Sequence, residues 1–428
     1  MAITTSAYTV YWYDATGAGY GMAGRIVDAG VSVLPNPGMK IGLNGDPKVK
    51  GFIDTGNNLR IAVTDRVAGQ SQSVFIHDAT NGQQVGSAQT WPEDNLYTLV
   101  RLGNYLYAID YDNAKVIEIS ATAPYAATGV SFSLASVTPS LIPPGSQACG
   151  QALIVLNGTL YGLFAFPDST WSNYANSLLV RFAIAGSGTG RTISVSASNG
   201  TLAKNAFAVA SDGTDLYVAA IGGKQTQGDY NENSRLQKIN ASLTTVTNVM
   251  SASPKGGTPP AFPYEFRDIS FKGSVAYILA GAYDSNWNLR GKLFSTTDFS
   301  TLTNIDDFSS GAAVAGSFWS AQYTPDNDRL WYTRGNDIRI YNASNLTQVG
   351  DPLTVTVGSL IAQGDQYTDL NDLSYVGPAG GSVSLRGYRS PLQRSNTPFA
   401  QAARALTRGR PELTEEEFQQ LAKTHGAP

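Results

Sequence analysis

The sequence predicts an all-β fold built from repeated four-stranded sheets, on the evidence of short alternating segments, hairpin turns and a long repeat period. The clearest copy runs from Lys50 to Thr90, where four short segments are separated by turn residues, among them Gly56–Asn58 and Asp78–Gly82. Segments of this kind are typical of β-strands joined as hairpins. Such a sheet has two unpaired edges and an apolar face that it cannot bury alone, so it must pack against copies of itself.

Six copies of the repeat align on the turn into the second strand, where Gly, Asn or Asp precedes an apolar pair. The aligned positions are 47 to 60 residues apart and are Leu59, Leu106, Leu160, Leu216, Ala276 and Leu330. A period near this length that contains only strands is typical of a β-propeller, whose blades are four-stranded sheets.

A seventh copy is expected to be divided between the two ends of the chain. Leu370–Val376 and Ser382–Arg389 supply two strands after the sixth copy, and no third strand follows them. Residues Val10–Gly17 match Val74–Gly82, which is a third strand with the turn after it. We therefore expect Val10–Asp14 to pair beside the Ser382–Arg389 strand, because this closes a ring of seven blades and removes its free edges.

The repeats resemble the large β-propeller superfamily. The turn Asp78–Gly82, Asp-Ala-Thr-Asn-Gly, is similar to the strand-and-turn signatures of surface-protein propellers. The resemblance covers about residues 3 to 390, implies an architecture and brings no activity with it. We expect a seven-bladed propeller over residues 1–390 and a short helical tail over residues 391–428.

The composition narrows the classes of function. Charged residues make up 14% of the chain, the net charge is −4 and there are 44 Gly, a profile common in secreted and virion proteins. No basic stretch alternates with aromatic residues, so nucleic acid is not an expected partner. Cys149 is the single cysteine, which excludes an intrachain disulfide and a thiolate metal cluster.

The N-terminal residues bear on the expected location of the protein. Met1–Ser6 have neither a positive region nor an apolar core, so no N-terminal signal peptide is visible. No apolar run is long enough to span a membrane, so membrane insertion is not expected. We expect the protein on an extracellular surface or in a virion. It would leave the cell by a route that needs no N-terminal signal or be assembled inside a cell into a virus particle, or else the numbering begins on a processed or recombinant form.

Strand alternation predicts that the long loops emerge on one face of the ring. They join second to third strands or neighbouring sheets, and they span residues 167–176, 222–234, 284–290, 35–48, 137–150 and 253–264. Loops carry specificity on a repeat scaffold, and aromatic side chains stack on sugars or anchor protein interfaces. The candidate binding residues in the loop regions are Trp91, Trp171, Tyr174, Tyr230, Phe262, Tyr264 and Trp287. The alternative is that these side chains cap the blade cores.

Carboxylates offer an enzymatic alternative, because a glycoside hydrolase or lyase uses a pair of them. The candidates are Asp168, Asp229, Glu232 and Asp284 on the long loops and Asp268, Asp369 and Asp372 on first strands near the central channel. Hairpin turns and solvated surfaces use the same residues. The two histidines, His77 and His425, do not indicate a metal site or a Ser-His-Asp triad.

Two acidic segments, Asp110–Asn113 and Asp326–Asp328, resemble fragments of calcium-binding loops. Neither has the full ligand set of a twelve-residue loop, and Asp and Asn are also the residues that tight turns prefer. No metal and no other cofactor is therefore predicted.

The tail has a different composition from the repeats. Phe399–Arg408 is an Ala- and Arg-rich helical run, and Thr414 with Glu417 forms the capping box of a second helix. The apolar residues of these two helices are candidates for docking on another molecule or on the ring itself, and they include Phe399, Leu406, Leu413, Phe418 and Leu421.

These observations favour a non-catalytic structural or attachment component of an extracellular surface or virion assembly. Its partners would be other protein subunits, copies of itself included, and glycans held by the long-loop face. The enzymatic alternative, a carbohydrate-active hydrolase or lyase, requires two carboxylates about 5 to 10 Å apart in a cleft. A third class is an intracellular interaction scaffold.

Overall fold

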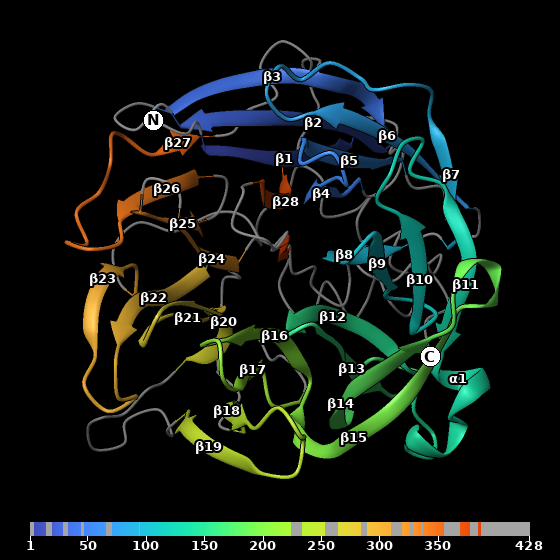
Figure 1. Cartoon of the computed structure of the whole chain (residues 1–428). Helices are drawn as coiled ribbons and strands as arrows, with labels where there is room; N and C mark the ends of the chain where they lie inside the picture. The colour runs from blue at the N-terminus through green and yellow to red at the C-terminus, as the bar shows by residue number, and fades with distance from the viewer. Residues whose placement is uncertain are drawn as a thin grey trace, which may run out of the picture.

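The computed structural model describes residues 4–13, 19–28, 33–43, 47–65, 71–93, 95–223, 233–252, 264–283, 289–309, 319–325, 328–334, 337–354, 369–376 and 384–386 of the 428-residue chain. Six four-stranded antiparallel sheets and one five-stranded sheet surround a common centre, with the first strand of each four-stranded sheet innermost (Figure 1). The fold is therefore an all-β propeller, as the sequence predicts.

The six four-stranded sheets each use four consecutive strands. They are β4 (Val49–Ile53), β5 (Leu59–Asp65), β6 (Gln72–Asp78), β7 (Gln89–Trp91); β8 (Leu96–Leu102), β9 (Tyr105–Asp110), β10 (Lys115–Ser120), β11 (Ala127–Ser133); β12 (Cys149–Leu156), β13 (Thr159–Pro167), β14 (Tyr174–Ala185), β15 (Thr192–Lys204); β16 (Ala206–Ser211), β17 (Leu216–Ala220), β18 (Arg235–Ile239), β19 (Val246–Ser251); β20 (Glu265–Lys272), β21 (Val275–Tyr283), β22 (Leu289–Thr296), β23 (Thr303–Asp307); and β24 (Trp319–Thr324), β25 (Arg329–Arg334), β26 (Asp337–Asn342), β27 (Leu353–Thr354). One short helix, α1 (Leu134–Val137), and two 3₁₀ turns, Pro139–Leu141 and Gly188–Gly190, complete the described elements.

The predicted repeat is confirmed in these six sheets. Each of the six aligned apolar positions lies in the second strand of its sheet, in β5, β9, β13, β17, β21 and β25. The turns before these strands are short, and Asn157 and Gly158 before β13 both have positive φ, at 50° and 73°. Consecutive positive-φ residues produce the turn twist that matches a hairpin, which is why Asn-Gly is favoured there.

The five-stranded sheet combines both ends of the chain in the order β29-β28-β1-β2-β3, where β29 is Ser384–Arg386, β28 is Asp369–Val376, β1 is Thr4–Tyr13, β2 is Gly19–Asp28 and β3 is Val33–Leu43. β1 pairs antiparallel with β28, and β29 pairs with the other side of β28. The expected pairing of Val10–Asp14 beside Ser382–Arg389 is therefore wrong. Three N-terminal strands belong to this sheet, and the first of them, β1, is the direct neighbour of β28.

The prediction of a loop over Pro35–Lys48 is also wrong, because β3 occupies most of this segment. Pro35 and Pro37 pair with Ile26 and Gly24 of β2, and β3 lies at the outer edge of its sheet. Proline lacks an N–H donor and is tolerated in an edge strand, where half of the backbone groups have no neighbouring strand to meet. The two prolines therefore mark a sheet edge rather than a loop.

The hydrophobic core lies between neighbouring sheets. One cluster joins the β8–β11 sheet to the β12–β15 sheet through Tyr107, Phe132, Phe164 and Phe182, among others. A second joins the β12–β15 sheet to the β16–β19 sheet, with Leu163 and Val218 fully buried. Burial between sheets provides the stability that no disulfide supplies, since Cys149 is a free, buried thiol.

Four innermost strands contain a β-bulge one or two residues from their start. The register shifts occur in β8, β12, β16 and β20, and the extra residues are Tyr97, Gln151, Phe207 and Arg267. All four side chains are buried. A bulge adds local twist and changes the direction of one side chain. In each of these four strands the bulge directs one side chain into the protein interior.

Tyr217 in β17 gives a prediction for alkaline pH. Burial, together with a hydrogen bond donated to Asp212 Oδ2 at 3.0 Å and the charge of that carboxylate, raises the Tyr217 pKa to about 12. The unfolded chain has a tyrosine pKa of about 10, so this stabilisation is complete below pH 10 and is lost as pH rises towards 12. We expect denaturant unfolding to show the native protein losing about 2 kcal/mol more than Tyr217→Phe between pH 9 and pH 12. Equal losses in the two proteins would contradict this assignment.

Candidate functional site

Two predicted long loops meet on one face of the ring. Ser146, in the connection from β11 to β12, forms a β-bridge with Asp168, in the loop from β13 to β14. Gln147 N also donates to Pro167 O at 2.8 Å. The connection from β11 to β12 and the connection from β13 to β14 therefore share one side of the ring, which we call the long-loop face.

The candidate aromatic residues that the structure describes do not form one exposed patch. Trp91 is 1% exposed, and its indole N–H donates to Tyr125 O at 2.9 Å. Trp171 is half-buried and stacks on Tyr111 at 5.9 Å between ring centroids. Tyr264 is half-buried and packs against core residues. For Trp91 the alternative of a blade-core residue is the correct interpretation, whereas Tyr230, Phe262 and Trp287 lie outside the described residues.

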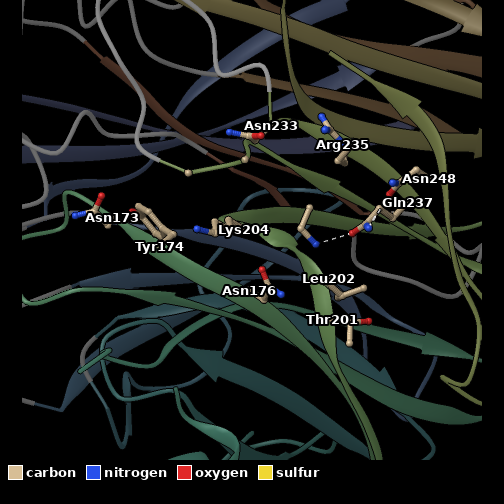
Figure 2. Close-up of a pocket in the computed structure, with 13 residues that line it drawn as sticks. Asn173, Tyr174, Asn176, Thr201, Leu202, Lys204, Asn233, Arg235, Gln237 and Asn248 are labelled. Carbon is tan, nitrogen blue, oxygen red and sulfur yellow. Dashed lines mark hydrogen bonds between the residues drawn. The ribbon is translucent and has the colours of Figure 1, made fainter. Parts of the chain in front are cut away.

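Tyr174 lies at a pocket between the β12–β15 sheet and the β16–β19 sheet (Figure 2). The pocket has a volume of 520 Å³ and opens among residues of the long loops 167–176 and 222–234. It is lined mainly by amides, a hydroxyl, glycine backbone and two cations: Asn173, Tyr174, Asn176, Thr201, Leu202, Ala203, Lys204, Gly222, Gly223, Asn233, Arg235, Gln237 and Asn248. Among the described lining residues there is no carboxylate.

One wall of the pocket is fixed by backbone contacts around Asn205, which is 2% exposed. Asn205 Nδ2 donates to Gly223 O at 2.9 Å, and Gly222 N donates to Lys204 O at 2.9 Å. Gly222 has φ of 99°, and a Cβ there would lie 2.3 Å from the backbone carbon of Asn233. Only glycine fits where the backbone of residue 222 passes that of Asn233. Both ends of the 222–234 loop are therefore held against the end of β15.

A second wall is ordered by Gln237 on β18. Its Oε1 accepts from Ala203 N at 2.7 Å, and its Nε2 donates to Asn248 Oδ1 at 2.9 Å (Figure 2 shows both side chains). These two bonds determine which way each amide points, because Oδ1 of Asn248 is used as an acceptor. The Asn248 N–H groups are then directed to donate elsewhere.

Of the four candidate carboxylates that the structure describes, Asp168 serves a turn and Asp268 a contact between strands. Asp168 Oδ1 accepts from the backbone N–H groups of Thr170 and Ser172, and its Oδ2 accepts from Asn173 Nδ2 at 2.9 Å. These donors hold the Asp168 pKa well below its usual range. Asp268 Oδ2 joins β20 to β24 through Ser320 Oγ at 2.6 Å and Ala321 N at 3.0 Å. Asp369 and Asp372 lie on β28, and Asp229, Glu232 and Asp284 lie outside the described residues.

The remaining sequence candidates also have structural roles. His77 is 2% exposed, and its Nδ1 lies 3.0 Å from Gly82 O across the turn after β6. Asp110 Oδ1 accepts from Asn113 N at 2.8 Å, as turn residues do. Asp328 pairs with Lys272 at 2.6 Å. Within the described part of the chain, no three His, Cys, Asp or Glu side chains come together as metal ligands would.

Two predictions concern segments that the structure describes only in part or not at all. The helical tail over residues 391–428, with its five candidate docking residues, lies outside the described residues. Among the residues that are described, no helix has the length and apolar character needed to cross a membrane.

No protein-family model and no curated protein matches the sequence. Among solved structures, the fold is similar to a candidate 6-phosphogluconolactonase from Bacteroides uniformis ATCC 8492, with a TM-score of 0.54, 10% identity and coverage of 88% of this chain and 100% of that chain. A candidate 6-phosphogluconolactonase from Bacteroides fragilis NCTC 9343 has a TM-score of 0.49 and 12% identity, over 82% of this chain and 95% of that chain. The β-propeller domain of the Trilobed protease from Pyrococcus furiosus has a TM-score of 0.44 and 11% identity, over 81% and 96%. The predicted resemblance to β-propellers is confirmed at the level of the fold, and no specific family is identified.

The polar residues of the pocket are the part of the site that sequence reasoning missed. They come from β14, β15, β18, β19, the loop between β13 and β14 and the loop between β17 and β18, so no single segment shows the pattern. The one local signal is the run Asn173-Tyr174-Ala175-Asn176, in which two amides flank a predicted aromatic residue. An interest in aromatic side chains alone selects Tyr174 and passes over Asn173 and Asn176 beside it.

Proposed function

We propose that this propeller is a non-catalytic attachment component of an extracellular surface or virion assembly, and that the pocket between the β12–β15 and β16–β19 sheets binds a glycan. The observation that carries the proposal is the lining of the pocket. Amide and hydroxyl side chains converge on a space of 520 Å³, and no carboxylate is found among its described lining residues.

The chemistry of the lining suits sugar hydroxyls. Asparagine and glutamine side chains offer both a donor and an acceptor, as each sugar hydroxyl requires, and Tyr174 adds an apolar surface. The preformed wall around Asn205 lowers the entropic cost of binding, because the loop ends are ordered before a ligand arrives. Concave sites with a few fixed polar groups are the usual form of small-ligand pockets.

The alternative of a carbohydrate-active hydrolase or lyase has less support. Such an enzyme needs two carboxylates facing the scissile bond. Asp168, the nearest candidate in the chain to Asn173, already accepts hydrogen bonds from its own loop. Release of reducing ends from a bound oligosaccharide would favour the enzyme over the binding component.

The binding proposal predicts the effect of one amide. The Asn176 side chain is exposed and has no hydrogen bond to any described residue. We expect Asn176→Ala to weaken binding of the best ligand on a glycan array about 2- to 10-fold, because one net hydrogen bond is lost. Thermal unfolding should be unchanged.

The matched control is Asn104→Ala, which removes an exposed asparagine from the short turn between β8 and β9. This variant should bind as the native protein does. Equal effects of the two substitutions, or no glycan binding by the native protein, would contradict the proposed function.

We also propose that the ring has seven blades, with β28, β1, β2 and β3 as the seventh and β29 as an added strand at the centre. Support comes from the neighbours of the two C-terminal strands. β28 lies beside β4, as the first strands of other adjacent sheets lie beside each other, and β29 lies beside β24. An experimental structure would count the blades, and a ring closed without β1 would contradict this arrangement.

The tail over residues 391–428 completes the proposal as the segment that docks on other subunits. Its support is the sequence pattern of two short amphipathic helices with Phe399, Leu406, Leu413, Phe418 and Leu421 on their apolar faces. Isolated helices this short are marginal in water, so they need a surface to order them. Light scattering of the chain without residues 392–428 tests this role, and undiminished assembly would rule it out.

A further inference from the structure

We infer that β15 is a docking edge for a second copy of this chain, and that two copies pair their β15 strands antiparallel through residues 192–199. This contact forms whether or not the pocket binds a glycan. Its basis is the length and composition of an outer strand that is paired on one side only.

β15 is the outermost strand of its sheet and lies on the rim of the ring (Figure 1). It has 13 residues, which makes it the longest strand that the structure describes, and its inner side pairs with β14. Along residues 192–199 no backbone group bonds to a described residue outside this sheet. An outer edge of this kind leaves N–H and C=O groups open to another strand.

The other outer strands carry features that limit pairing. β7, β11, β19, β23 and β27 have between 2 and 7 residues. β3 has 11 residues, but it contains Pro35, Pro37 and Lys40. Short strands, proline and lysine all protect an edge from other chains. Between Thr192 and Ala203, β15 has neither a proline nor a charged residue.

Bulges also protect an edge, and β15 has most of them beyond Asn199. There the register with β14 shifts twice, whereas residues 192–199 contain one extra residue, Ser196. The Ser196 hydroxyl donates to Arg181 O at 3.0 Å and accepts from Arg181 Nε at 3.1 Å, so this bulge is bonded back to β14. Residues 192–199 are therefore the part of the edge that remains suited to pairing.

The side chains of this segment suit a copy of itself. Thr192, Ser194, Ser196 and Ser198 are all exposed, small and uncharged. Antiparallel pairing around a two-fold axis brings the same segment of both copies together, where like charges repel but hydroxyl groups bond to each other. Each copy uses the same edge, so the contact closes with two copies and joins two four-stranded blades into one sheet.

Sedimentation velocity of the full chain over a range of protein concentrations tests the pairing. The native chain should form a dimer, and Ser194→Lys combined with Ser198→Lys should raise its dissociation constant about 10-fold or more, because four lysines enter the contact. Both positions are exposed, so the thermal unfolding of the monomer should be unchanged. A native chain that stays monomeric at every concentration would overturn the inference.

The matched control is Thr247→Lys combined with Ser251→Lys, which adds the same charges at the same spacing to exposed positions of β19. This variant should dimerise as the native chain does, and equal losses in the two variants would overturn the inference. Hydrogen exchange locates the contact, because backbone amides within 192–199 should exchange more slowly as the dimer forms. Association without this protection would place the contact elsewhere and would also overturn the inference, whatever the pocket binds.

Discussion

Replacing Trp91 with alanine should lower the free energy of unfolding by about 3 to 5 kcal/mol, the range found for truncation of buried aromatic side chains. Trp91 is 1% exposed and packs among Phe52, Leu96 and Tyr125 between the β4–β7 and β8–β11 sheets. The substitution leaves a cavity and also removes the donor to Tyr125 O, which is buried. Denaturant unfolding measures the loss.

Trp171→Ala is the comparison, because Trp171 is half-buried and should cost distinctly less. Trp91→Phe should recover part of the stability by refilling the space without restoring the hydrogen bond. If Trp91→Ala instead kept its stability and lost glycan binding, Trp91 would be the ligand contact that its loop position first suggested. The pair of variants therefore separates a core residue from a binding residue.

Local signals account for the parts of the fold that the sequence predicts well. The second strands and their tight turns are encoded within a few residues, as at Asn157-Gly158, where positive φ at both positions is needed before β13. Period and alternation then imply the ring, because each sheet has faces that only another sheet can cover.

The errors arise where a residue's neighbours are distant in sequence. Pro35 and Pro37 look like loop residues until β3 is known to be an edge strand. Val10–Asp14 has the alternation of a third strand, but alternation is the same in every strand, so it does not show that β1 pairs with β28. Trp91 looks like a loop aromatic until Tyr125, 34 residues later in the chain, is seen to accept its N–H.

The pocket is harder still to predict, because its polar residues are ordinary one at a time. Asn248 and Lys204 are typical surface residues in their own strands, and Gly222 resembles any turn glycine. Their common role depends on the contact between two sheets and on the close approach of Gly222 to Asn233. The sequence pointed to the two long loops beside the pocket and to one lining residue, Tyr174, but not to the other lining residues.

Arg191→Met should destabilise the protein by about 3 kcal/mol, because it breaks a buried ion pair that joins two sheets. Glu118 on β10 is 1% exposed, and its Oε2 accepts from Arg191 Nε at 3.0 Å. Arg191 precedes β15, and it also donates to Tyr107 OH at 2.7 Å and lies 4.0 Å above the ring of Tyr105. We expect the lower end of the usual range of 3 to 5 kcal/mol, since Tyr107 and Thr128 continue to donate to the carboxylate.

The informative comparison is the double variant Glu118→Gln with Arg191→Met. Removing one partner leaves a buried charge without its counter-ion, whereas removing both charges avoids that cost. The double variant should therefore be more stable than Arg191→Met alone in denaturant unfolding, even though it carries more substitutions. The alternative result is that the loss in the double variant equals the sum of the losses in Glu118→Gln and Arg191→Met. That result would mean that the two charges do not interact, and that the β8–β11 and β12–β15 sheets are held together by their apolar cluster alone.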